Sequence, residues 1–230
     1  MTEGSYLKLS TFSITARCPQ TGRVGVAVAT ASMAVGALCP VVVPEIGAAA
    51  TQAWVNPLLA ETAVRYLADG RDAETALELA LKKDSDCQYR QLAVVPVSGA
   101  PAAWTGGKCD PFAGQHLGEE WVVLGNMLKG IQVLDAVHAC FAAGADMELS
   151  QRLLRALEAG VQAGGDRRGL ESAALIVADG PEFPYVDLRV DWHEQPVAEL
   201  RRLYNLWNKR VLRHYSALQS RFSDYRAAEC

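Results

Sequence analysis

Residues 24–31 read Val-Gly-Val-Ala-Val-Ala-Thr-Ala, a run of small and almost wholly apolar side chains. A strand that keeps no polar face is normally covered on both sides, so this run predicts a strand inside a layered sheet. Residues 11–17, Thr-Phe-Ser-Ile-Thr-Ala-Arg, alternate and are rich in β-forming side chains. The turn signal Cys-Pro-Gln-Thr-Gly at 18–22 separates the two segments, which predicts that they pair as a hairpin.

Strand signals and helix signals alternate in groups along the rest of the chain. Asn56 and Asp72 each precede a helical apolar pattern, and Pro57 fits the first position of a helix. We expect helices over 57–69, 73–83, 131–143, 148–163 and from 196 for about 30 residues. We expect further strands over 46–54, 92–97, 102–105, 121–124, 172–178 and 185–190. Paired strands separated by paired helices predict an α+β fold, with helices outside two stacked, mainly antiparallel sheets.

No low-complexity linker or internal repeat divides the chain, so we expect a single domain over 1–230. Within it we distinguish an N-terminal leader, 1–10, and an extended C-terminal helix, 204–230. Apolar residues at helical spacing form a stripe towards the end of the chain: Leu200, Leu203, Trp207, Val211, Tyr215, Leu218 and Phe222. The length of this stripe favours packing on a partner subunit, which predicts a homodimer. The alternative is that the helix folds back on its own core.

Composition and charge exclude several classes of protein. Half of the 230 residues are apolar, which is enough for a sizeable core. A formal charge of −4 without a basic block disfavours nucleic acid as a partner. No apolar run approaches the roughly 18 residues that span a bilayer, and residues 1–8 lack a signal-peptide pattern, so we expect a cytoplasmic protein that does not bind membranes. Six scattered cysteines without a C-x-x-C pair predict reduced thiols and no metal site, and no motif requires a cofactor.

The segment 164–169, Gly-Gly-Asp-Arg-Arg-Gly, is the most unusual polar stretch of the sequence. It connects a predicted helix to a predicted buried strand, and such loops often carry functional side chains. Arg167 or Arg168 could bind a carboxylate through the planar guanidinium, while Asp166 or Glu171 could act as a base or hold that arginine. The alternative interpretation is a solvated loop containing a salt bridge.

The predicted strand at 186–191 carries charges on one face only. Because side chains alternate along a strand, Asp187, Arg189 and Asp191 point the same way. Such a row needs partners if it is buried, and the charged residues near 164–171 are available. The alternative is an exposed edge strand whose charges prevent aggregation.

Three weaker candidates complete the site. Gln52 and Asn126 each follow or end a predicted strand and could bind an amide or a carboxylate. His193, two residues after Asp191, could serve in base catalysis or could be a surface or helix-capping residue. The sequence contains no G-x-S-x-G elbow, P-loop, H-E-x-x-H or complete G-x-G-x-x-G motif, so the corresponding nucleophile, zinc-protease and nucleotide sites are not expected.

Several of these blocks together resemble a bacterial family named domain of unknown function 1028. The similar stretches are 11–14, 21–22, 24–29, 34–37, 50–53, 125–126, 164–169 and 185–191, and the resemblance covers about residues 11–203. One departure is Trp192, because the family pattern before His193 has two acidic residues. That family is grouped with the N-terminal nucleophile hydrolases. The resemblance therefore implies a four-layer αββα sandwich and hydrolysis of an amide bond by an N-terminal Thr, Ser or Cys, whose free α-amine acts as base.

By position, the nucleophile that the resemblance implies is Thr11. It follows ten residues, so it can act in this way only if the bond after Ser10 is cut. The leading hypothesis is an amide-bond hydrolase acting on a small metabolite, in which Arg168 or Arg189 binds a substrate carboxylate. The side chains expected to orient these groups are Asp166, Glu171 and Asp187. The alternatives are a catalytically inactive small-molecule-binding protein on the same scaffold and a mainly structural dimer module.

Overall fold

The computed structural model describes residues 7–180, 184–215 and 217, which contain two antiparallel β-sheets flanked by helices. In the first sheet the strand order is β1-β5-β6-β7, and β4 also pairs with β5. The bounds of these strands are β1 Lys8–Leu9, β4 Pro40–Val43, β5 Gly47–Trp54, β6 Arg90–Pro96 and β7 Ala102–Thr105. In the second sheet the order is β11-β10-β3-β2-β9-β8. Its strands are β2 Thr11–Arg17, β3 Val24–Thr30, β8 Gly114–Leu117, β9 Trp121–Gly125, β10 Ser172–Ala178 and β11 Val186–Val190.

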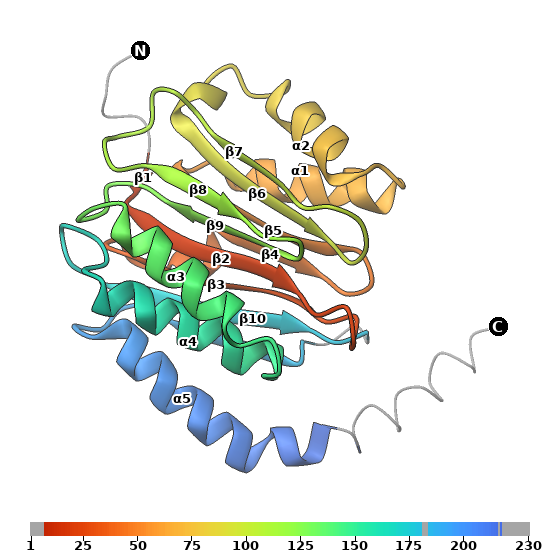
Figure 1. The fold of residues 1–230 in the computed structure, drawn as a ribbon, viewed down its shortest axis with the longest axis vertical. Helices are drawn as coiled ribbons and strands as arrows, with labels where there is room; N and C mark the ends of the chain where they lie inside the picture. Colours follow the sequence, from red (N-terminus) through yellow and green to blue (C-terminus); the bar gives the residue numbers. More distant parts are fainter. Residues whose placement is uncertain (1–6, 181–183, 216, 218–230) are drawn as a thin grey trace.

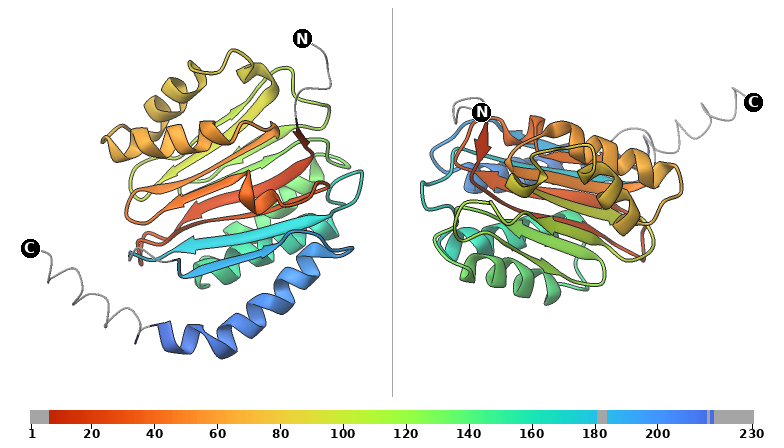
Figure 2. Two further views of the ribbon diagram at one scale, coloured as in Figure 1. Left: turned by 180° about the vertical axis from the view of Figure 1, so that it is seen from behind. Right: turned by 90° about the horizontal axis from the view of Figure 1, so that it is seen from above.

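The two sheets face each other, and the helices cover their outer sides (Figure 1). Helices α1 (Pro57–Ala68) and α2 (Ala73–Leu81) contact the first sheet, whereas α3 (Gln132–Ala142), α4 (Leu149–Gln162) and α5 (Pro196–Arg210) lie on the second. Figure 2 shows the same arrangement from behind and from above. The described residues also form the short 3-10 helices η2 (Val35–Ala37), η3 (Cys87–Tyr89) and η4 (Leu212–His214). The predicted α+β sandwich with two mainly antiparallel sheets is thus confirmed.

Strand β3 is covered on both faces, as its small apolar side chains predict. All seven of its residues are buried. Val26 and Val28 belong to the apolar cluster between the sheets, while Ala27 and Ala29 belong to the cluster beneath α3, α4 and α5. The predicted hairpin is also confirmed, because β2 and β3 pair antiparallel with Thr11 opposite Thr30.

The first two helices begin at the predicted caps. The Asn56 side chain accepts a hydrogen bond from Leu58 N at 3.2 Å, and the Asp72 side chain accepts one from Thr75 N at 2.8 Å. These bonds satisfy backbone donors that the first turn of a helix leaves without partners.

The structure differs from the predicted elements in three short strands and in the C-terminal helix. Strands β1, β4 and β8 were not expected, because each is only two to four residues long and has no extended alternation. The predicted C-terminal helix begins at Pro196 as expected, but α5 ends at Arg210, and the 3-10 helix η4 follows over Leu212–His214. Residues 218–230 of that prediction lie outside the described residues. Within residues 7–180, 184–215 and 217, no helix combines the length and the apolar character needed to cross a bilayer.

Candidate functional site

Thr11 begins β2 at one end of the space between the two sheets. Phe12 and Ile14 belong to the apolar cluster beneath the helices, so the alternation of the strand directs Thr11 and Ser13 towards the first sheet. The Thr11 side chain has no exposed surface. The candidate nucleophile is therefore fully buried while residues 7–10 precede it.

The peptide carbonyl that precedes Thr11 lies between two hydrogen-bond donors at the end of β3. Thr30 Oγ1 donates to Ser10 O at 2.6 Å, and the Ala31 N–H donates to the same oxygen at 3.2 Å. Thr11 Oγ1 in turn donates to Thr30 Oγ1 at 3.1 Å. Two donors that converge on one carbonyl oxygen are the arrangement that stabilises an oxyanion when the carbonyl carbon is attacked.

Asp166 places a buried carboxylate next to Ala31 N, one of the two donors to the Ser10 carbonyl. Its Oδ2 accepts from Ala31 N at 3.3 Å and its Oδ1 accepts from Arg168 N at 2.8 Å, while Arg168 Nε lies 3.8 Å from Oδ1. Burial raises the pKa of Asp166, and the Arg168 N–H, the Ser10 hydroxyl and the Arg168 guanidinium offset part of that rise. The Ser10 hydroxyl influences this pKa although it makes no hydrogen bond of good geometry within the described residues. A carboxylate with a raised pKa is suited to accept a proton.

The backbone of 164–169 explains how Asp166 reaches this position. Gly165 and Gly169 adopt φ of +59° and +97°, values that glycine adopts without steric cost. Asp166 forms a β-bridge with Leu128, and Lys129 N donates to Gly165 O at 3.1 Å. The segment is thus held by the turn that follows β9. Arg167 and Arg168 are exposed and, with Lys129 and the first turn of α5, line a surface cavity of about 500 Å³.

A buried polar network connects the two sheets next to Thr11. Ser13 Oγ donates to Gln52 Oε1 at 2.7 Å, and Gln52 Nε2 donates to Gln91 Oε1 at 2.9 Å and to Thr11 O at 3.4 Å. Asn126 Nδ2 donates to the same Gln91 oxygen at 3.0 Å, and Asn126 N donates to Thr11 O at 2.9 Å. Gln52 and Asn126, both predicted as site residues, therefore meet at Thr11.

Gln91 was missed by sequence reasoning, although this network centres on it. It is fully buried on β6, and its Nε2 also lies 2.9 Å from Gly125 O and 3.0 Å from Gly114 O. The signal was present, because Gln91 directly precedes the apolar run 92–95 in a predicted strand. A polar side chain at a buried strand position must find hydrogen-bond partners.

The charged row on β11 lies apart from this group. Asp187 and Arg189 pair with each other at 3.1 Å on the edge strand of the second sheet. Strands β10 and β3 separate β11 from β2, and three strand spacings of about 4.8 Å amount to about 14 Å. No hydrogen bond or ion pair joins Asp187 or Arg189 to Thr11 or Asp166 in the described ranges. The position of the row agrees with the alternative of a charged edge strand.

Glu171 and His193 have exposed side chains. Glu171 N donates to Thr30 O at 2.8 Å, so its backbone, and not its carboxylate, supports the site. His193 Nδ1 accepts from Gln195 N at 2.9 Å, directly before α5. The exposed position agrees with the alternative of a surface residue, and His193 N donates to Glu171 O at 2.8 Å.

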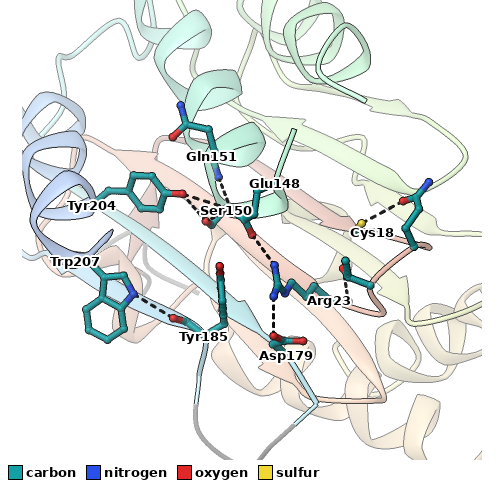
Figure 3. Close-up of polar contacts among 11 residues, drawn as sticks. Cys18, Arg23, Glu148, Ser150, Gln151, Asp179, Tyr185, Tyr204 and Trp207 are labelled. Carbon is teal, nitrogen blue, oxygen red and sulfur yellow. Dashed lines mark hydrogen bonds and ion pairs between the residues drawn. The ribbon is translucent and has the colours of Figure 1, made fainter. Parts of the chain in front are cut away.

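A second polar cluster, which the sequence did not suggest, lies at the opposite end of β3 (Figure 3). Arg23 pairs with Glu148 at 3.3 Å and with Asp179 at 2.8 Å, and its guanidinium lies over the Tyr185 ring. Burial by itself would lower the pKa of Arg23. The hydrogen bond to Asp179 and the charges of the nearby acidic groups outweigh burial, so the pKa of Arg23 is raised. Glu148 also caps α4 by accepting from Gln151 N at 3.2 Å. The cluster thus ties the start of α4 to β10.

A family model described as a family of unknown function, DUF1028, matches residues 11–200. The chain belongs to the DUF1028 family. The crystal structure of protein SPO2555 from Silicibacter pomeroyi, itself assigned to DUF1028, is similar to this chain with a TM-score of 0.82 and 34% sequence identity, over 90% of this chain and 93% of that one. No curated protein matches.

The match to DUF1028 begins at Thr11 and leaves residues 1–10 outside it. In the part of this DUF1028 protein that the structure describes, no group of three or more His, Cys, Asp or Glu side chains is placed to hold a metal ion. The chemistry that the site offers comes from the hydroxyls of Thr11 and Thr30, the Ala31 N–H and the Asp166 carboxylate.

Proposed function

We propose that this DUF1028 protein is an amide-bond hydrolase of the N-terminal-nucleophile type, built on a four-layer αββα sandwich. Thr11 is the nucleophile, and it becomes N-terminal when the Ser10–Thr11 bond is cut. The observation that carries the proposal is the position of the Ser10 carbonyl, whose oxygen accepts from both Thr30 Oγ1 and Ala31 N. The start of the family match at Thr11 is a second support.

The first reaction in this proposal acts on the protein itself. Thr11 Oγ1 attacks the Ser10 carbonyl carbon, the C–N bond breaks, and the proton of the hydroxyl passes to the departing nitrogen. The product is an ester between Ser10 and Thr11 Oγ1, which water hydrolyses to a Ser10 carboxylate and a free Thr11 α-amine. Thr30 Oγ1 and the Ala31 N–H stabilise the negative charge on the carbonyl oxygen during both steps.

The same groups then serve an external substrate. The Thr11 α-amine accepts the hydroxyl proton while Oγ1 attacks the amide carbonyl, the amine of the substrate leaves with a proton, and water releases the acyl group. Asp166 accepts a hydrogen bond from Ala31 N and so orients that donor. Arg168 lies beside Asp166 at the surface cavity, which suits the binding of a substrate carboxylate.

Intact mass before and after incubation tests the proposal. We expect the mass of the chain that begins at Thr11, and we expect Thr11→Ala to keep the full mass. Thr11→Ser, which retains a hydroxyl, should still be cut. Two results together would refute the proposal. The first is a wild-type chain that keeps its full mass. The second is a chain prepared to start at Thr11 that cleaves no amide and forms no adduct with an electrophile directed at N-terminal threonine.

A second candidate function is a binding protein that has lost catalysis. It is favoured by the ordered pairing of Lys8 and Leu9 with β5, which closes the site in the uncut chain. While the leader is attached, the Thr11 nitrogen is an amide and cannot accept a proton. This candidate predicts an intact mass, together with small-molecule binding that Thr11→Ala leaves unchanged.

The predicted homodimer remains a proposal about the C-terminal stripe. Leu200, Tyr204 and Tyr215 are buried against their own domain, whereas Leu218 and Phe222 lie outside the described residues. Light scattering during gel filtration tests it, because a single-chain mass would contradict a dimer.

The cytoplasmic location is likewise a proposal, which cell fractionation tests.

A further inference from the structure

Residues 7–10, the described part of the leader, lie directly before Thr11 and add a short β-strand to the edge of β5. Lys8 pairs with Trp54 and Leu9 with Ala53, and Val55 N donates to Leu7 O at 3.1 Å. Strand β4 pairs only with Gly47–Ala50 of β5, so the last part of that edge is paired by the leader.

Each leader residue meets a different environment. The Leu9 side chain is fully buried and belongs to the apolar cluster between the sheets. Lys8 Nζ lies 4.7 Å from the centroid of the Trp54 ring, which stacks on Tyr89 at 4.4 Å. Lys8 O accepts from Ser32 Oγ at 3.4 Å. The edge of β5 thus offers two adjacent side-chain sites: one that accepts a cation, against Trp54, and one that accepts an apolar side chain, between the sheets.

Ser10 occupies the position next to the reacting bond. Its side chain is fully buried, and its hydroxyl lies near enough to Asp166 to lower the pKa of that carboxyl, so the position accepts only a small side chain. A larger side chain would have to displace closely packed neighbours.

We infer that the substrate is a short peptide whose acyl side adds to β5 in place of the leader, with the order cationic, apolar, small. Cleavage follows the small residue, as in Lys8-Leu9-Ser10. Addition of an extended peptide to a free strand edge is an established mode of recognition, in which backbone hydrogen bonds give affinity and side-chain sites give specificity. The inference rests on the proposed function for cleavage, but its binding part does not need catalysis.

The test uses a chain released at Thr11 from a removable fusion partner, with circular dichroism to check its fold. A fluorescent peptide, acetyl-Lys-Leu-Ser with a free carboxylate, should bind in a polarisation assay. Replacing its leucine by aspartate should weaken binding at least tenfold, because the apolar position would take up a charge. Absence of binding, or equal binding of the aspartate peptide, overturns the inference.

A second arm measures cleavage of acetyl-Lys-Leu-Ser-aminomethylcoumarin. We expect a kcat/KM at least tenfold above that for the same amide carrying only acetyl-serine. If both are cleaved at equal rates, the peptide inference fails while the proposed hydrolase stands. If the peptide binds but no amide is cleaved and no electrophile labels Thr11, the proposed hydrolase fails while the recognition of the peptide stands.

If the shortened chain fails to fold, the full chain carrying Leu9→Asp replaces it in the binding arm. An aspartate cannot remain in the buried Leu9 position without cost, so the leader should leave the edge and the added peptide should take its place. The unchanged full chain is the matched control and should bind at least tenfold more weakly. Equal binding by the two chains contradicts the inference.

Discussion

Replacing Gln91 by leucine removes the side chain on which the polar network between the sheets converges. Leucine can make none of these hydrogen bonds. The buried groups Asn126 Nδ2 and Gly125 O and the part-buried Gly114 O lose their bonds to this side chain, while Gln52 Nε2 keeps its bond to Thr11 O at 3.4 Å. A buried polar group left without a partner costs about 1–3 kcal/mol, so two such groups reduce the free energy of unfolding by about 4 kcal/mol. For a domain of this size, the expected fall in Tm is about 8–16 °C.

Thermal and urea unfolding followed by circular dichroism measure this effect. Gln162→Leu is the matched control, because it makes the same chemical change on an exposed position of α4 and should alter the free energy of unfolding by at most about 0.5 kcal/mol. The urea slope of Gln91→Leu should equal that of the wild type, because the surface exposed on unfolding is unchanged. A loss below about 1 kcal/mol, or an equal loss in the control, refutes the reasoning.

Three further changes have defined outcomes. Because burial raises the folded-state pKa of Asp166, its ionisation destabilises the fold. The free energy of unfolding of the wild type, minus that of Asp166→Asn, should therefore fall as the pH rises from about 3.9 through the raised pKa. Urea unfolding at several pH values measures this difference, and a difference that does not change with pH would contradict the prediction. Gly165→Ala should lower the free energy of urea unfolding by about 1–2 kcal/mol, because Gly165 has φ +59°, which strains an alanine. An added Cβ meets no atom closer than 3.8 Å, so a steric clash does not contribute, and an unchanged stability would exclude backbone strain. Arg23→Met should cost about 1–3 kcal/mol, because it removes the ion pairs of two part-buried carboxylates, Glu148 and Asp179. Arg202→Met removes an exposed pair and should cost at most about 0.5 kcal/mol; equal losses in the two variants would contradict this difference.

The amino-acid sequence by itself determined part of the local structure of this protein. Asn56 and Asp72 cap helices as predicted, and the 11–17 and 24–31 segments pair as a hairpin. Capping bonds and short turns join residues only a few positions apart, so their signals can be recognised without the rest of the fold. The alternation of 186–191 likewise predicted which side chains share a face.

Only the tertiary structure decided which polar residues meet. Gln52, Gln91 and Asn126 come from three strands in two sheets, and no local pattern states which strands become neighbours. The order of strands placed Arg189 on an edge, and the turn after β9 holds Asp166 against Ala31 N, which also donates to Ser10 O. Packing between distant segments sets these positions, because the burial that stabilises a fold depends on the whole chain and not on a window of it.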